Sequence, residues 1–300
     1  QIFRYLVMIE QGFLSANDDP LTFNLISGVI LAGITGAVIF GGLNRIAGTA
    51  RVLVPLMTGL YLVTVMFALL INVNAIPEAL SLIIRDAFTG EAAAGGSVLA
   101  VILYGVQRGA YSNEAGMGTE SLVHGAAKTN EPIREGLVAM LGPILDTLVV
   151  CTATALMILI AGTWQSDASQ GVTLTANAFS TLLGPAGTVV VFVCVLCFAT
   201  TTMFTYSFYG SQCASFVFGS KHITTYRLIF VVSIVLIAVI SIESAVSLID
   251  GSFALMAIPT MVSAIWLAPK VLQAARVYFA KLDADDDTPN PQTDISGLPS

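Results

Sequence analysis

Polar residues and glycines interrupt a long apolar stretch of the chain between residues 104 and 118. Arg108 and Glu114 bring charges into it, and Asn113 brings an amide that needs hydrogen-bond partners. The stretch also contains glycines at positions 105, 109, 116 and 118, each of which weakens a continuous helix. Free carbonyls and half-helix ends at such a break bind cations and zwitterions. The pattern therefore predicts a broken helix that forms a ligand site.

The candidate ligand contacts in this stretch are Gly109, Tyr111 and Asn113. Arg108 and Glu114 are candidates for a structural or an ion-coupling role, because charged side chains are costly at membrane depth and usually mark function there. Two alternatives remain open. The helix could end near Gly105, with the remainder forming a loop. Arg108 and Glu114 could also form an ion pair that locks the segment without touching a ligand.

A second polar insertion lies in the apolar run that contains residues 198–210. Helical spacing places several hydroxyls on one face: Thr202, Thr205, Tyr206 and Tyr209, with Thr201 beside them. Neutral hydroxyl oxygens suit Na⁺, a hard cation, when backbone carbonyls share the site. Ser and Thr hydroxyls also commonly bond across or back onto helices. Periodicity alone favours this ordinary structural role.

Asp146 lies within another apolar run, where its carboxylate could couple transport to an ion. A hydrogen bond to a hydroxyl or to the backbone is an equal alternative. Cys194 and Cys197 form a CxxC inside an apolar run with no second Cys/His pair nearby, which favours two small buried hydrophobic residues. The sequence shows no catalytic triad, nucleotide-binding loop, metal cluster or basic nucleic-acid patch. We therefore expect no enzyme and no nucleic-acid partner.

The composition requires that most side chains face lipid. Hydrophobic residues make up 56% of the 300-residue chain and charged residues 10%, with a mean hydropathy of +0.85. A soluble domain of this size needs more charge to cover its surface. The expected fold class is therefore an all-α integral membrane protein in a lipid bilayer. Seven apolar runs have about the length of a span: 21–40, 52–73, 96–118, 137–162, 188–209, 223–242 and 253–271.

Basic residues in the loops predict the orientation of the chain. Alternate loops hold Arg45 and Arg51, then Lys128 and Arg134, then Lys221 and Arg227, and finally Lys270, Arg276 and Lys281. The opposite loops are mostly acidic, with Arg85 as their one basic residue. We expect a multi-pass protein of the inner cell membrane with a cytoplasmic C-terminus. Residues 280–300 predict an acidic, disordered tail, and residues 1–20 a partial span and an extracellular loop.

Five stretches, in order along the chain, resemble signatures of the alanine or glycine:cation symporter family. They are residues 38–46, 108–118, 124–129, 146–152 and 255–259, and the second reads Arg-Gly-Ala-Tyr-Ser-Asn-Glu-Ala-Gly-Met-Gly. The resemblance implies a LeuT-type fold of two inverted five-helix repeats. On that mapping residues 21–279 supply the fourth to tenth core helices. The first core helix is then missing, so we expect an N-terminally truncated chain.

The resemblance also implies that a small neutral amino acid, such as alanine or glycine, is imported with sodium by alternating access. Na⁺ is then the coupling ion, and no other metal or cofactor is expected. By position in the eighth core helix, Thr201 and Thr202 become candidate sodium ligands, and Thr202, Met203 and Tyr206 candidate substrate contacts. Met203 and Tyr206 replace the Ile and Trp that usually close the family's pocket, which predicts a pocket of different shape and polarity.

Two rival hypotheses accompany this interpretation. The first is a proton-coupled or uncoupled amino-acid permease of the same fold, in which Asp146 or Glu114 titrates. The second is a channel, or a sensor that binds an amino acid without moving it.

Overall fold

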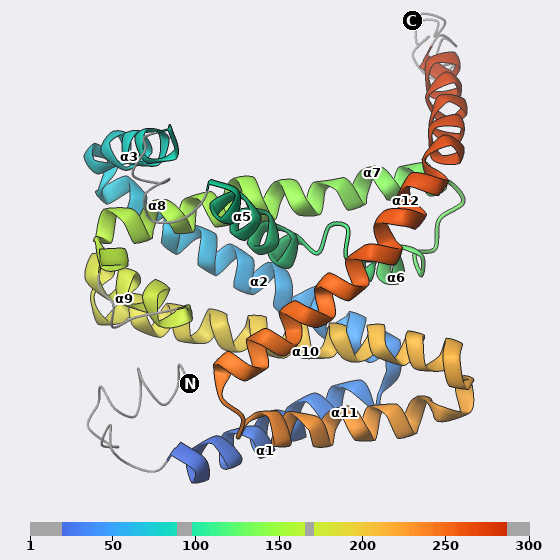
Figure 1. Cartoon of the computed structure of the whole chain (residues 1–300), viewed down its shortest axis with the longest axis horizontal. Coiled ribbons are helices and arrows are strands. Elements are labelled where there is room, and N and C mark those ends of the chain that lie inside the picture. Colours follow the sequence, from blue (N-terminus) through green and yellow to red (C-terminus); the bar gives the residue numbers. More distant parts are fainter. Residues whose placement is uncertain (1–19, 89–97, 166–170, 287–300) are drawn as a thin grey trace, which may run out of the picture.

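The computed structural model describes residues 20–88, 98–165 and 171–286, and the regular structure in these residues is helical throughout (Figure 1). Within these ranges, six helical stretches are long and apolar enough to cross a membrane. They are α1 (Pro20–Ile39), α2 (Gly42–Ile71), α10 (Pro185–Phe218), α12 (Ile242–Asp286), the continuous run Ser220–Ile237 of η5 and α11 (Ile223–Ile237), and the continuous run of α7 (Pro132–Pro143), η3 (Ile144–Cys151) and α8 (Thr152–Ala161). The shorter elements are η2 (Val73–Ala75), α3 (Ile76–Phe88), α5 (Val98–Asn113), α6 (Thr119–His124), η4 (Thr163–Gln165), α9 (Val172–Leu183) and η5 (Ser220–His222).

The spans differ from the predicted runs mainly at their ends. The run at 96–118 yields α5, a helix of only 16 residues, so the described residues hold six long spans and one interrupted one. Helices α3 and α9 fall in stretches that we predicted as loops. Helix α12 continues through residues 280–286, where we expected the disordered tail to begin. The rest of that tail, and residues 1–19, lie outside the described residues.

Small residues let α1 and α11 approach closely. Gly28, Ala32 and Gly36 fall one turn apart on one face of α1, and all three are buried. A Cβ on Gly28 would come within 2.8 Å of the Cβ of Ala238, which directly follows α11. Side chains larger than hydrogen would therefore push the two helices apart. Helices in lipid associate through this kind of close contact, because lipid provides no hydrophobic force between them.

Two clusters of buried apolar side chains join α1, α2, α8, α9 and α10. The first joins α2, α8, α9 and α10, with Val65, Met157 and Phe179 fully buried at its centre. The Tyr61 hydroxyl adds a 2.6 Å hydrogen bond to the Thr154 hydroxyl between α2 and α8. The second cluster joins α1, α2 and α10 through Ile39, Ile46, Phe204, Phe208 and Tyr209. Most other large apolar side chains are exposed, as a lipid-facing surface requires.

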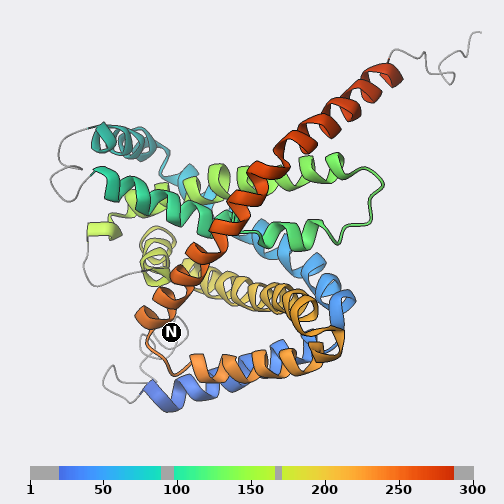
Figure 2. The ribbon, with the colours of Figure 1, turned by 45° about the vertical axis from the view of Figure 1, so that its right-hand side comes forward.

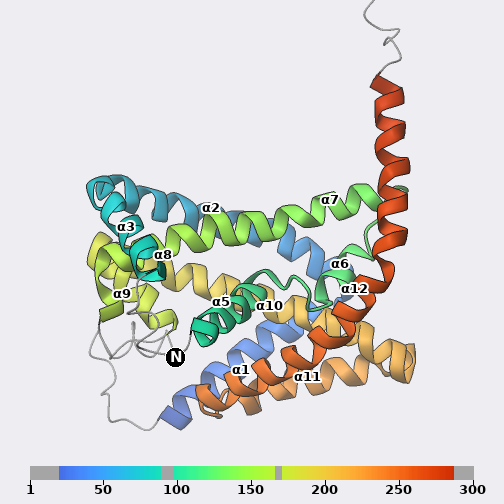
Figure 3. The same ribbon diagram turned by 45° about the horizontal axis from the view of Figure 1, so that its top comes forward.

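The long helices lie side by side, and α12 crosses them obliquely (Figures 1 and 3). The connection from α1 to α2 and the one from α10 to α11 lie at the same end of the molecule, on the right in Figure 1. At that end the last part of α12 turns and runs crosswise to the spans in both views. Figure 2 shows this part projecting beyond the other helices. The bundle therefore brings α5, α7–α8, α10 and α12 together while the end of α12 stands apart.

Candidate functional site

The helix break lies between α5 and α6. Helix α5 continues through Asn113, so the alternative that it ends near Gly105 is wrong. The next residues have left-handed backbone at Glu114 (φ 57°), Gly116 (φ 80°) and Gly118 (φ 87°). The Asn113 side-chain oxygen accepts a 2.9 Å hydrogen bond from the Ala115 N–H, a local bond that competes with further helix. The predicted interruption is therefore present, at residues 114–118.

Glycine is required at Gly116 and Gly118 for two reasons. Positive φ angles suit glycine, since it has no Cβ to clash with the backbone. The segment also passes close to α12: a Cβ on Gly118 would come within 2.6 Å of the Thr260 hydroxyl, and one on Gly116 would collide with the Met261 side chain. The broken backbone is thus fixed against α12.

Two tyrosines hold the Glu114 side chain at the break. The Tyr209 hydroxyl of α10 donates a 3.3 Å hydrogen bond to Glu114 Oε2, and Tyr206 also interacts with this carboxylate. Left-handed backbone is uncommon at a residue other than glycine and costs energy. The tertiary contacts of Glu114 must therefore offset the energetic cost of its left-handed backbone. This places a carboxylate where the backbone is irregular.

An aromatic cluster lies beside the same carboxylate. The rings of Tyr111 (α5) and Tyr206 (α10) both pack on Phe253 (α12), with centroid separations of 5.1 Å and 6.3 Å. Tyr206 also packs on Tyr209 at 5.4 Å. Two sequence candidates from distant parts of the chain, Tyr111 and Tyr206, are thereby brought together. Phe253 was missed, because in the sequence it is one more apolar residue at the start of a span.

Arg108 pairs with a residue that the sequence did not single out. Its guanidinium lies 3.4 Å from Asp250 Oδ2 on α12 and 5.9 Å from the centre of the Tyr111 ring. The structure therefore gives Arg108 the partner Asp250 in place of the Glu114 pairing that we left open. The ion pair holds α5 against α12 beside the aromatic cluster.

Asp146 lies near the middle of the continuous 30-residue run Pro132–Ala161, in the π-helical turn η3. Its Oδ2 accepts a 2.7 Å hydrogen bond from the Ser112 hydroxyl, and the Asn113 amide donates one of 3.1 Å to Thr147 Oγ1. Turn η3 begins directly after Pro143, which has no N–H to donate to the helix. Single π-helical turns are rare and often mark functional positions. Two hydrogen bonds, Ser112 to Asp146 and Asn113 to Thr147, thus join the end of α5 to η3.

The threonines of α10 bond mainly to their own helix. The Thr201 hydroxyl is buried and donates to the Cys197 carbonyl at 2.8 Å, and Thr205 donates to the Thr201 carbonyl at 3.0 Å. Thr202 is exposed. Met203 faces α1, because its sulfur accepts a 3.8 Å hydrogen bond from the fully buried Thr35 hydroxyl. The structure therefore does not bring Met203 into the aromatic cluster with Tyr206.

Gly109 lies in helical α5 with no neighbouring atom within 4 Å of where a Cβ would stand. The glycine side of α5 is therefore open in the described part of the chain. It lies one turn before Asn113 and one residue after Arg108. A ligand that reached this face would meet backbone without a side chain in the way.

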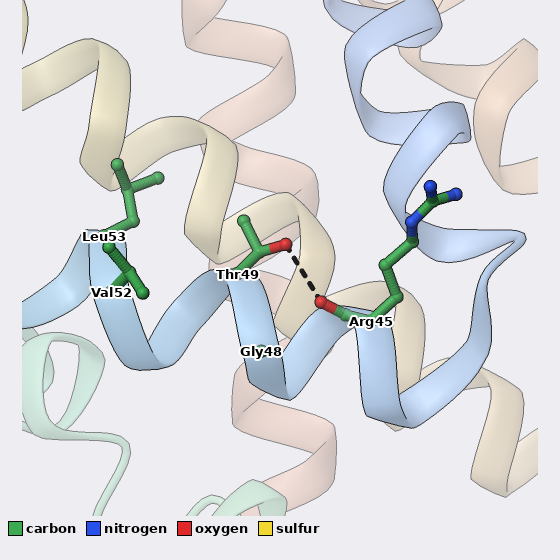
Figure 4. Close-up of a pocket in the computed structure, with 5 residues that line it drawn as sticks. All are labelled: Arg45, Gly48, Thr49, Val52 and Leu53. Atoms are coloured by element: carbon green, nitrogen blue, oxygen red, sulfur yellow. Dashed lines mark hydrogen bonds between the residues drawn. The ribbon is translucent and has the colours of Figure 1, made fainter.

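A shallow hollow of about 390 Å³ lies elsewhere, along α2 (Figure 4). It is lined by Arg45, Gly48, Thr49, Val52 and Leu53. The Thr49 hydroxyl is already used, because it donates to the Arg45 carbonyl at 2.9 Å. The Arg45 side chain donates to the Ala37 carbonyl, also at 2.9 Å. The hollow contains none of the candidate residues and is not the site that the break forms.

Among the described residues, carboxylates outnumber guanidinium groups around α5. Glu114, Asp146 and Asp250 bring three carboxylates to α5 and its break, where Arg108 supplies a single guanidinium through its pair with Asp250. Uncompensated carboxylates are expensive away from water. A cation beside Asp146 or Glu114 would offset part of this negative charge. The arrangement can therefore bind a cation beside aromatic rings and free helix ends.

A family model and several known proteins match this chain. A model of the sodium:alanine symporter family matches residues 8–292. A Haemophilus influenzae protein described as an uncharacterized transporter is 36% identical over 269 residues, which cover 87% of this chain and 59% of that protein. The sodium/alanine symporter AgcS of Methanococcus maripaludis is 35% identical over 257 residues, covering 85% of this chain and 56% of AgcS.

The probable sodium/glutamine symporter GlnT of Bacillus subtilis is 32% identical over 267 residues, which cover 89% of this chain and 56% of GlnT. The chain thus spans less than two thirds of the length of these relatives.

Proposed function

The chain belongs to the sodium:alanine symporter family, a family of transporters and not of enzymes, and on that premise we propose that the protein imports a small neutral amino acid together with Na⁺ by alternating access. The inward sodium gradient and the membrane potential then drive uptake, the potential supplying about 2.3 kcal/mol per charge per 100 mV. The six long apolar stretches of the bundle are the segments that cross the membrane in this proposal. We further propose a LeuT-type arrangement in the inner membrane, with the basic loops and the C-terminus on the cytoplasmic side.

The observation that carries this proposal is the break at residues 114–118, with aromatic and carboxylate side chains gathered beside it. Half-helix ends offer partial charges to an amino acid, whose carboxylate and ammonium need opposite partners. Asn113 and Tyr111 lie at the end of the first half-helix. Together with Gly109 they are the proposed substrate contacts on α5.

Tyr206 is the residue that we propose to shape the side-chain pocket. It packs on Phe253 and lies beside Glu114, whereas Met203 is turned towards Thr35 on α1. The Tyr206 ring offers an apolar surface and a hydroxyl group at this place, which favours a substrate with a neutral side chain, apolar or weakly polar. Alanine, glycine and larger neutral amino acids are therefore all candidates, in keeping with relatives described as an alanine symporter and as a probable glutamine symporter. Thr202 and Met203 remain proposed contacts at its margin.

Sodium has two proposed ligand sets. Thr201 and Thr202 offer hydroxyl oxygens, and a hydroxyl that donates its proton to its own helix, as Thr201 does, keeps lone pairs for a cation. Asp146 offers a carboxylate at mid-span beside the Ser112 hydroxyl. The same carboxylate favours the second candidate function, proton-coupled transport, because a carboxylate within a membrane span often serves as a proton carrier.

The decisive experiment is uptake of labelled alanine into proteoliposomes that contain the full-length protein, with and without an inward sodium gradient. We expect accumulation that needs sodium. Uptake that follows a proton gradient and ignores sodium would replace this proposal with the proton-coupled one. Binding without net flux would identify a sensor, and unitary currents a channel.

A further inference from the structure

The last part of α12 leaves the bundle and runs crosswise to the long helices (Figures 1 and 3). After Pro269, α12 continues as helix to Asp286. In Figures 1 and 3 this end runs crosswise to the long spans, at the end of the bundle where α10 meets α11. If the spans cross the bilayer, a helix crosswise to them at their end lies along the bilayer surface.

The segment has one apolar and one polar face. At 3.6 residues per turn, one face carries Val271, Leu272, Ala275, Tyr278, Phe279 and Leu282. Leu272 is 60% exposed and Phe279 47% exposed, while Ala275 and Tyr278 are half-buried, so the described helices leave most of this face uncovered. The other face carries Lys270, Gln273 and Lys281, with Arg276 at its edge and Val277 as its one large apolar side chain. In water such a helix would leave its apolar face without a partner.

The side chains before the segment mark the edge of the bilayer. Trp266 is 78% exposed and stands one turn before Lys270. An exposed Trp followed by Lys is typical of the boundary between hydrocarbon and headgroups. Residues 270–284 contain three basic residues against one acidic residue, Asp283, and the helix then ends on two further carboxylates, Asp285 and Asp286. The segment thus begins at the headgroups with its basic residues spread along it, and its carboxylates are gathered at its far end.

We propose that residues 270–284 form an interfacial helix, with the apolar face in the lipid of one leaflet and Lys270, Arg276 and Lys281 on its anionic headgroups. The leaflet is the cytoplasmic one in the orientation proposed above. The helix anchors the end of the last span and makes its position sensitive to the anionic lipid content. The inference needs only that the bundle spans the membrane, and it is independent of substrate and coupling ion.

Two spin-label positions of the same residue type test it. Ala275 lies at the centre of the apolar face and Ala280 on the polar face. Each is changed to Cys in the full-length protein after Cys151, Cys194, Cys197 and Cys213 have been replaced by Ala. The labelled proteins are reconstituted in vesicles of phosphatidylcholine with phosphatidylglycerol. We expect the label at 275 to collide mainly with oxygen, which dissolves in lipid, and the label at 280 mainly with a water-soluble nickel complex.

Charge is tested in the same assay. Removing the three basic residues (Lys270→Gln, Arg276→Gln and Lys281→Gln) lowers the equilibrium constant for the bound helix by roughly fivefold per charge, which corresponds to about 1 kcal/mol each. The charge-preserving set Lys270→Arg, Arg276→Lys and Lys281→Arg is the matched control and leaves the collision pattern unchanged. In vesicles of phosphatidylcholine alone, the wild-type helix should bind the bilayer as weakly as the triple Gln variant does in the mixed vesicles.

Two results would overturn the inference. Equal access of the nickel complex to both labels would show a helix that stands in water. Strong dipolar coupling between labels of two protein copies would show that a second copy covers the apolar face. Both results are independent of uptake, so a failed transport assay leaves this test intact.

Discussion

The Ser112 hydroxyl donates a 2.7 Å hydrogen bond to Asp146 Oδ2 and so ties the end of α5 to the π-helical turn of a neighbouring span. The bond joins the two irregular features of the described bundle, the break after Asn113 and the turn after Pro143. A carboxylate held in this way near mid-span is placed to exchange a hydroxyl partner for a cation. The coupling ion is therefore expected to act here.

The first prediction concerns this carboxylate. Asp146→Asn keeps the size of the side chain and removes its charge, so the apparent affinity for sodium in uptake should fall by roughly tenfold or more, as loss of a charged interaction of about 1.5–3 kcal/mol implies. Uptake measured against sodium concentration checks it. Asp283→Asn, at the end of α12, is the control and should behave as the wild type. An unchanged sodium dependence in Asp146→Asn would make Asp146 a purely structural residue.

The second prediction concerns Phe253, which joins Tyr111 to Tyr206. Phe253→Ala removes both ring contacts, and aromatic pairs contribute about 0.5–1.5 kcal/mol beyond burial. The KM for the amino acid should rise by roughly two- to tenfold while sodium dependence persists. Phe216→Ala is the matched control, because Phe216 is 91% exposed on α10. If both variants change KM equally, the aromatic cluster does not line the substrate site.

The sequence predicts the break well because its cause is local. The glycines, Asn113 and the polar side chains all lie within the segment that they interrupt, and the structure locates the break at residues 114–118. The apolar runs predict the spans for the same reason.

The sequence does not predict which side chains on different helices contact one another. Asp250 and Phe253 carry no local signal, since their roles depend on where α12 crosses α5. The same limit applies to Met203. Its neighbours along α10 suggest a pocket residue, yet its sulfur meets Thr35 on α1, a contact fixed by the packing of two distant spans. Thr201 shows the reverse case: its bond to Cys197, four residues earlier, is the ordinary role that periodicity alone favours.

The third prediction tests the requirement for glycine at the break. Gly118→Ala combines a left-handed backbone with a Cβ 2.6 Å from the Thr260 hydroxyl, so it should lower the free energy of unfolding by about 1–3 kcal/mol or more. Gly105→Ala places the same methyl group on α5, where no atom lies within 4 Å, and should be neutral or slightly stabilising. Thermal unfolding in detergent compares the two. Equal unfolding temperatures would contradict the close approach to α12.

The fourth prediction concerns pH and Glu120 in α6. Burial raises the pKa of the Glu120 carboxyl above its ordinary value, nearby His124 lowers it by a smaller amount, and Glu114 adds to the rise. The folded state therefore binds the proton more tightly than the unfolded state. The stabilisation is complete below the ordinary pKa and is lost as the pH rises through the folded pKa. Glu120→Gln should make the free energy of unfolding decline less steeply with pH in this window. Unfolding measured at several pH values across the window checks this. An equally steep decline in the variant would mean that other groups cause it.

The last prediction concerns Gly210 on α10 and Tyr226 on α11. A Cβ at Gly210 would collide with the hydroxyl and the ring end of Tyr226, so the tyrosine packs directly on the α10 backbone. Gly210→Ala alone must displace Tyr226 and should destabilise the protein by about 1–3 kcal/mol, as overpacking does. Tyr226→Leu removes the obstructing end of the ring. In the double variant the alanine should therefore cost less than in the wild-type background.

A double-mutant cycle of unfolding free energies measures this coupling. We expect an interaction energy of at least about 0.5 kcal/mol between the two positions, with the double variant more stable than the sum of the single effects predicts. Gly219→Ala combined with Tyr226→Leu provides a non-contacting pair, since no atom lies within 4 Å of a Cβ at Gly219. The free-energy changes of Gly219→Ala and Tyr226→Leu should be additive, even though an alanine at position 219 is strained by the left-handed backbone (φ 87°). Additivity at Gly210 as well would mean that Tyr226 does not obstruct a side chain at this position of α10.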